Sequence, residues 1–280
     1  MFYAFCALPF IACQNRTSDA AGVKKEIFTN NDLEAVINRG NINRTTLPDT
    51  SVLNLYQGNG RFGCSYGPLG LHINPAKSHL EEYGKTEYIH MQHFTRAKFG
   101  SDYLLPLAHV FWESDPEKVS GYNQCQSFYN GTVTTRFEQA TGKVTVTTWF
   151  DPVDRDIAGI QIDVDGEAPA VIISPDEKLK VHYNQDLEQK ASTSFESGTW
   201  KIELSCLNAA STLFVKTDAE VKQNGSGLRV QLHKGQNTIL ISVNKNQQVS
   251  GKQSLAQTVN WWRNKWDTSA SLDLPEEKAQ

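Results

Sequence analysis

The stretch Val144-Thr-Val-Thr-Thr-Trp-Phe150 decides the fold, because apolar and polar side chains alternate along most of it. Two later stretches, Ile160-Gln-Ile-Asp-Val164 and Ile239-Leu-Ile-Ser-Val243, show the same pattern. Alternation with a period of two places every second side chain on one face of an extended strand. Each stretch therefore predicts a β-strand with one face toward a core.

Residue pairs that end in glycine separate the strand-like stretches at short intervals, as in tight hairpins. They are Asn59-Gly60, Asn130-Gly131, Thr141-Gly142, Asp165-Gly166, Asn224-Gly225 and Lys234-Gly235. The strand pattern runs from residue 52 to residue 243. This is longer than the roughly 100 residues of an immunoglobulin-like domain. We therefore predict an all-β fold, a single large two-sheet antiparallel β-sandwich.

Two helices are predicted at the flanks of the sandwich. Residues 31–38 place Leu33, Val36 and Ile37 on one helical face. Residues 254–267 carry an apolar stripe with helical spacing, made of Leu255, Val259, Trp262 and Trp266. We expect Ser254 to cap the first turn of this second helix. Such a stripe needs a large surface to pack against, and Leu274-Pro-Glu-Glu277 has the form of another helix start, so a further domain is expected beyond it.

The N-terminus has the form of an export segment. Residues 1–13 are almost all apolar and residues 14–19 are polar. The apolar run is too short to span a bilayer, and Phe10-Ile-Ala-Cys13 resembles a bacterial lipoprotein cleavage site. We predict that residues 1–20 are an export signal and polar spacer, that Cys13 is lipidated, and that the protein is exported as a periplasmic or outer-membrane lipoprotein. Because the segment lacks a positively charged start, an ordinary buried segment is the alternative.

Composition narrows the possible functions. The 280 residues are 39% hydrophobic, enough for a full core, and carry a net charge of −4. We therefore expect no nucleic-acid partner, and membrane contact only through the lipid anchor. Cys64, Cys125 and Cys206 have no C-x-x-C spacing, so they predict no zinc site. The sequence leaves two alternatives for these cysteines: three free thiols, or one disulfide between two of them.

Four stretches together resemble a known family. They are Leu55–Tyr66 with its Gly58-Asn-Gly-Arg-Phe-Gly63 core, Gln126–Phe137, Trp149-Phe-Asp-Pro152 with Asp156, and Trp261–Trp266. They are similar to the N-terminal half of six-hairpin glycosidases, which are related to glycoside hydrolase families 65 and 95. The resemblance covers about residues 52–275.

The resemblance implies a galactose-mutarotase-like supersandwich at 21–250 and a linker helix at 251–280. In the family this helix leads to an (α/α)6 barrel that carries the catalytic carboxylates, and the sequence contains no such barrel. The resemblance therefore implies no catalytic residue and no cofactor in this chain. It also implies that Trp262 and Trp266 face the barrel.

Candidate sugar-binding residues are Asn59, Arg61, His93, Trp112 and Tyr122. Asn59 and Arg61 either contact sugar hydroxyls or hold a hairpin in which Arg61 pairs with a carboxylate. Trp112 and Tyr122 are the aromatic residues least obviously internal, and rings of this kind stack on pyranoses. His93 follows His90 at a spacing that separates them on a strand, so sugar contact or packing is favoured over a metal.

Carboxylates suited to glycoside hydrolysis are present, but each lies among polar residues, as solvated surface groups do. They are Glu81, Glu82, Asp115, Glu117, Asp151, Asp154 and Asp156. Two main functions stay open. One is a non-catalytic domain that supports the barrel of a glycoside hydrolase and shapes its cleft for an oligo- or polysaccharide. The other is a stand-alone carbohydrate-binding lipoprotein, and a mutarotase-like enzyme is a third.

Overall fold

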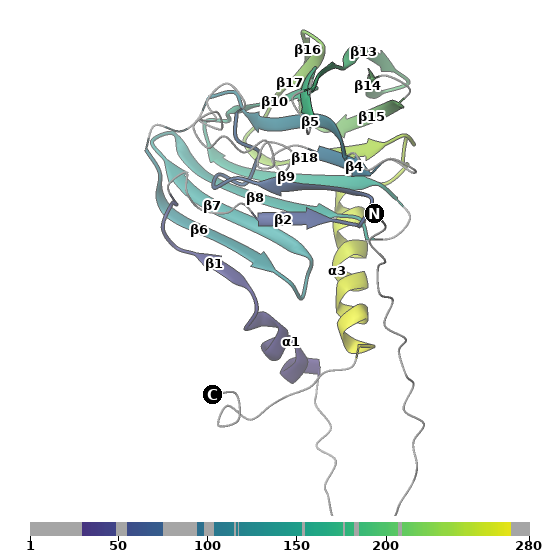
Figure 1. Ribbon diagram of the computed structural model, residues 1–280. Coiled ribbons are helices and arrows are strands. Elements are labelled where there is room, and N and C mark those ends of the chain that lie inside the picture. Colours follow the sequence, from purple (N-terminus) through teal and green to yellow (C-terminus); the bar gives the residue numbers. More distant parts are fainter. Residues whose placement is uncertain are drawn as a thin grey trace, which may run out of the picture.

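Figure 1 shows the computed structural model of the chain, in which two β-sheets are stacked and helix α3 (Gly251–Asp267) runs along one side. The structure describes residues 30–269, except 49–54, 75–93, 98–103, 115, 117, 153–154, 176, 182–184 and 207–208. Helix α1 (Asn30–Asn38) precedes the strands and confirms the helix predicted at 31–38.

The larger sheet has nine antiparallel strands, with the three stretches that predicted the fold next to one another. In spatial order it contains β1 (Ile42–Arg44), β6 (Ser120–Ser127), β7 (Thr132–Gln139), β8 (Gly142–Phe150), β9 (Ile157–Gly166), β18 (Gly235–Val243), β15 (Ala209–Thr217), β14 (Thr199–Cys206) and β13 (Lys190–Glu196).

The smaller sheet has seven antiparallel strands. In spatial order it contains β16 (Glu220–Asn224), β17 (Gly227–Gln231), β10 (Ala170–Pro175), β5 (Leu104–Trp112), β4 (Phe94–Ala97), β3 (Phe62–Tyr66) and β2 (Leu55–Gly58). A separate hairpin joins β11 (Lys178–Val181) to β12 (Gln185–Glu188).

The core lies between the two sheets. Val146, Ile160 and Ile241 from the nine-stranded sheet belong to one buried cluster with Val110 and Val171 from the seven-stranded sheet. The alternating stretches face this cluster with every second side chain, as their period requires. The predicted all-β, two-sheet antiparallel sandwich with a C-terminal helix is confirmed.

Glycines make the predicted turns possible. Gly60, Gly131, Gly225 and Gly235 have φ values of 86°, 66°, 59° and 98°, and each lies in or beside the connection between two successive strands. This left-handed region is open to glycine without the strain that a Cβ brings. The turns were therefore predictable from the dipeptides alone.

Helix α3 covers part of the outer face of the nine-stranded sheet, against β8, β9 and β18. Trp149 points to this outer face and is fully buried there. Its ring has room because Gly159 is its partner on β9, where an added Cβ would lie 2.0 Å from the ring. The indole Nε1 donates to Ser254 Oγ at 3.0 Å.

The predicted helix cap was wrong by one turn. Ser250 is the N-cap, and its hydroxyl accepts from the backbone N–H of Gln253. Ser254 is instead fully buried inside the helix against the sheet, as is Thr258. The sequence offers two serines with cap chemistry, and the position of Trp149 decides which one is buried.

Candidate functional site

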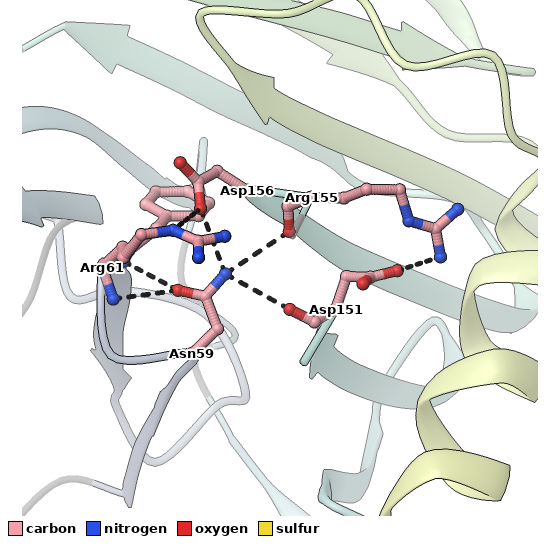
Figure 2. A network of polar contacts seen from close by, with 6 residues as sticks. Asn59, Arg61, Asp151, Arg155 and Asp156 are labelled. Atoms are coloured by element: carbon pink, nitrogen blue, oxygen red, sulfur yellow. Dashed lines mark hydrogen bonds and ion pairs between the residues drawn. The ribbon is translucent and has the colours of Figure 1, made fainter. Parts of the chain in front are cut away.

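The hairpin between β2 and β3 is held by one side chain, that of Asn59. Its Oδ1 accepts from the backbone N–H groups of Arg61 and Phe62 at 3.1 and 2.9 Å. Its Nδ2 donates to Asp151 O at 3.2 Å, Arg155 O at 3.4 Å and Asp156 Oδ1 at 3.2 Å. Figure 2 shows the amide between the hairpin and the loop that connects β8 to β9. Asn59 thus ties the seven-stranded sheet to the nine-stranded sheet.

Two ion pairs lie beside Asn59, and one of them also contacts helix α3. Arg61 Nε lies 3.1 Å from Asp156 Oδ1 (Figure 2). Arg155 pairs with the carboxylate of Asp151, which is 0% exposed, and the same guanidinium donates to Gln257 Oε1 on α3 at 2.5 Å. A buried carboxylate requires such a partner to offset its lost hydration. We call Asn59, Arg61, Asp151, Arg155 and Asp156 the junction network.

The turn between β6 and β7 makes a second contact with α3. Trp266 Nε1 donates to Phe128 O at 2.9 Å, and Arg263 Nε donates to Asn130 Oδ1 at 3.1 Å. The ring of Trp262 lies so close to Gly131 that an added Cβ would be 2.0 Å from it. The tryptophans of α3 therefore pack partly on this chain's own turn.

Gln57 on β2 links this turn to the central strands. Its Nε2 donates to Gly131 O at 3.1 Å and to Thr148 O at 3.2 Å, and its Oε1 accepts from Thr148 Oγ1 at 2.7 Å. Three of the four stretches that carry the family resemblance thus meet beside α3, which contains the fourth. The residues of these contacts lie as far apart in sequence as Gln57 and Gln257.

Asn59 and Arg61 occupy the hairpin arrangement that the sequence left as one alternative, with Arg61 paired to a carboxylate. Sugar binding by these two residues stays a prediction. Sequence reasoning missed Arg155 and Gln257, which complete the contact with the helix. Arg155 follows Asp151 by four residues, a spacing that could have suggested the pair, whereas nothing local indicates Gln257.

Trp112 and Tyr122 lie in the core, contrary to the expectation that they are the least internal aromatics. They are 3% and 7% exposed, so neither ring offers a face to a sugar. Trp112 Nε1 donates to Leu69 O at 3.2 Å, and Tyr122 Oη donates to Pro68 O at 2.9 Å. Both side chains hold the connection that follows β3. Burial raises the pKa of the Tyr122 phenol to about 12.

The remaining predicted residues are the histidine His93 and the cysteines. His93 and Cys13 lie outside the described residues. Within the described part of the chain, no group of three or more His, Cys, Asp or Glu side chains is placed to hold a metal, and no helix is long and apolar enough to cross a membrane. Cys64 and Cys125 are free thiols. Burial raises the pKa of the Cys64 thiol well above its usual range, which disfavours the nucleophilic thiolate.

The carboxylates of the junction network are engaged within the chain. Asp151 contacts Arg155, and Asp156 contacts Arg61. Together with the bond from Arg155 to Gln257, these contacts connect the β2–β3 hairpin, the β8–β9 loop and α3.

No family model matches the chain, and a search of curated proteins found no match. Among solved structures, the chain is similar to one described as "Putative kojibiose phosphorylase from human microbiome". The TM-score is 0.45 at 10% sequence identity, over 77% of this chain and 33% of that protein. The chain thus spans about a third of that protein's length. A similarity of this degree assigns neither a family nor an activity.

Proposed function

We propose that this chain is the non-catalytic sandwich and linker part of a carbohydrate-active enzyme of the six-hairpin glycosidase type. One observation carries the proposal: three of the four stretches that resemble this family lie far apart in sequence and meet around helix α3, which contains the fourth. The contacts among these stretches fix the helix on the sandwich. A helix held in this way can present a further domain at a defined angle.

The contacts of the junction network favour a structural role for it over a catalytic one. Its carboxylates are paired with arginines, and its amides are engaged with backbone groups of the same chain. In this proposal the exposed parts of Trp262 and Trp266 contact the (α/α)6 barrel, and the sandwich helps to shape a cleft for an oligo- or polysaccharide. Export with a lipid on Cys13 stays a prediction.

A second function has one observation in its favour. Helix α3 lies against its own sheet through Ser254, Thr258 and Leu255, and its tryptophans contact the β6–β7 turn. A helix with its inner face satisfied in this way is compatible with a stand-alone carbohydrate-binding sandwich.

The coding DNA downstream of codon 280 separates the two functions. The proposal expects an open frame that encodes repeated amphipathic helices with acidic residues between them. The longer product is then expected to cleave or phosphorolyse an oligosaccharide in a reducing-sugar or phosphate-consumption assay, while the 280-residue chain alone does neither. A stop codon at this point would contradict the enzyme proposal and favour the binding protein.

A further inference from the structure

An exposed aromatic pair lies at the end of the β13–β14 hairpin. Phe195 on β13 is the cross-strand partner of Trp200 on β14, with ring centroids 5.0 Å apart and an angle of 46° between the rings. Phe195 is 58% exposed, more than any other large hydrophobic side chain that the structure describes. Isolated apolar side chains at a surface are common, whereas two adjoining rings form a platform.

The platform arises because the core-facing row of β14 extends past the opposing sheet. Ile202 and Leu204 are buried in the main core, and Trp200, two residues earlier on the same face, is only partly covered. Phe195 lies opposite Trp200 on β13, the last strand of the sheet in the described part of the chain. Trp200 therefore packs against the core, whereas Phe195 beside it is more than half exposed.

Hydrogen-bonding groups lie next to the platform. Thr193, two residues before Phe195 and on the same face, donates from Oγ1 to Ser226 O in the β16–β17 turn. Residues two apart on a strand are about 7 Å apart, so this turn borders the rings. Asn224, the last residue of β16 before this turn, is exposed at the surface. β13, β14 and β16 lie at the same end of the molecule in Figure 1, away from the free end of α3.

Charge at the edge of the sheet disfavours a second protein strand as the occupant. β13 begins with Lys190 and ends with Glu196, both exposed. Charged side chains on an edge strand oppose strand-to-strand pairing. A ligand that uses the ring faces and a few hydrogen bonds, without backbone pairing, fits this edge better.

We propose that Phe195 and Trp200 form a surface site that binds a single soluble glycan chain, with the apolar face of a pyranose stacked on the rings. Stacking on an aromatic face with polar groups at its border is the arrangement that suits a sugar. Because the rings are inclined by 46°, they do not form the single flat surface that a crystalline polysaccharide would need. The site goes beyond the proposed function, since it needs neither a barrel nor catalysis.

Isothermal titration calorimetry of the whole chain with maltohexaose, cellohexaose, xylohexaose and laminarihexaose tests the site. We expect at least one of these glycans to bind. Phe195→Leu keeps an apolar side chain but removes the ring, and is expected to weaken binding about tenfold or more. Phe195→Trp is expected to retain binding. Leu47→Ala, which removes another exposed apolar side chain at a distant position, serves as the matched control and is expected to bind like the wild type.

Three results would overturn the site: no binding of any of the four glycans, equal binding by Phe195→Leu, or a wild-type dimer that this variant converts to a monomer in sedimentation experiments. The last result would make Phe195 a contact between copies of the chain. Circular dichroism checks that each variant is folded. Binding by this chain and catalysis by a longer product are separate readouts, so either proposal can fail without the other.

Discussion

The two ends of the sandwich differ in how far their polar and aromatic side chains are engaged by contacts within the chain. At the α3 end, the junction network and the tryptophans bind one another and the backbone. At the β13–β14 end, Phe195 and Trp200 pair with each other and leave one side open. The most conspicuous sequence stretch, Gly58–Gly63, turns out to be a structural connection. The proposed binding surface comes from a hairpin with no motif.

This difference has a physical origin. A connection between two sheets and a helix must satisfy buried donors, acceptors and charges, which demands particular residues at fixed positions. An aromatic platform needs only two rings on one face where an opposing sheet ends. Substitutions matched between the two ends therefore measure how strongly each end depends on its residues.

The largest loss of stability is expected for a glycine substitution. Gly159→Ala places a Cβ 2.0 Å from the ring of Trp149, beneath α3. Because the core there cannot yield without moving the helix, we expect a loss of about 3 kcal/mol or more in the free energy of unfolding. Gly198→Ala in the β13–β14 turn meets no atom within 4 Å and has only its positive φ of 76° to accommodate. Its expected cost is about 1 kcal/mol. Urea unfolding measures both, and equal losses would contradict a tightly packed junction.

The next largest loss of stability is expected for an asparagine substitution. Asn59→Asp replaces the Nδ2 donor, which faces three acceptors that include Asp156, with a second carboxylate oxygen. Like charges and unsatisfied carbonyls then meet in a partly buried site, and we expect about 3 kcal/mol of destabilisation at neutral pH. The same change at exposed Asn224 is expected to stay within about 0.5 kcal/mol. A mild effect at Asn59 would show that the hairpin holds without its amide.

The core between the two ends is tested by alkaline pH. The folded pKa of Tyr122 is raised from 10.0 to about 12, so the folded state keeps a proton that the unfolded chain loses. Stability is therefore present below about pH 10 and falls as the pH rises toward 12, by roughly 2–3 kcal/mol from this group. We expect Tyr122→Phe to reduce this fall by about 2 kcal/mol, although it also loses the bond to Pro68. An unchanged pH profile of urea unfolding would show that Tyr122 is accessible to water.

The smallest losses of stability are expected for serine substitutions. Ser254→Ala removes the acceptor of the buried Trp149 indole N–H, and we expect a loss of about 1–2 kcal/mol. Ser194→Ala removes a long contact with Glu196, 3.5 Å, at the other end and is expected to change stability by less than about 0.5 kcal/mol. Thermal unfolding measures both variants. If both variants lose the same stability, the hydrogen bond from the Trp149 indole N–H to Ser254 contributes nothing measurable.

The candidate site was only partly predictable. The hairpin at Asn59-Gly60 and the pairing of Arg61 with a carboxylate follow from turn chemistry and from the charge of arginine, and both are present. Trp112 and Tyr122 were misjudged because they have polar neighbours in sequence that lie elsewhere in the fold. Glu113 follows the end of β5, and Asn123 lies on the other face of β6. Which face meets the opposing sheet depends on strand register across the sandwich, which is not a local property.

The sequence by itself determined the strands, their turns and helix α1, because period-two alternation and glycine turns act over a few residues. Only the tertiary structure decided that β8, β9 and β18 are neighbours, that Trp149 faces α3, and that Ser250 caps this helix while Ser254 is buried. It also decided that Phe195 remains exposed. These features depend on which segments pack together over long distances along the chain, and the free energy of that packing belongs to the assembled sandwich and to no single stretch.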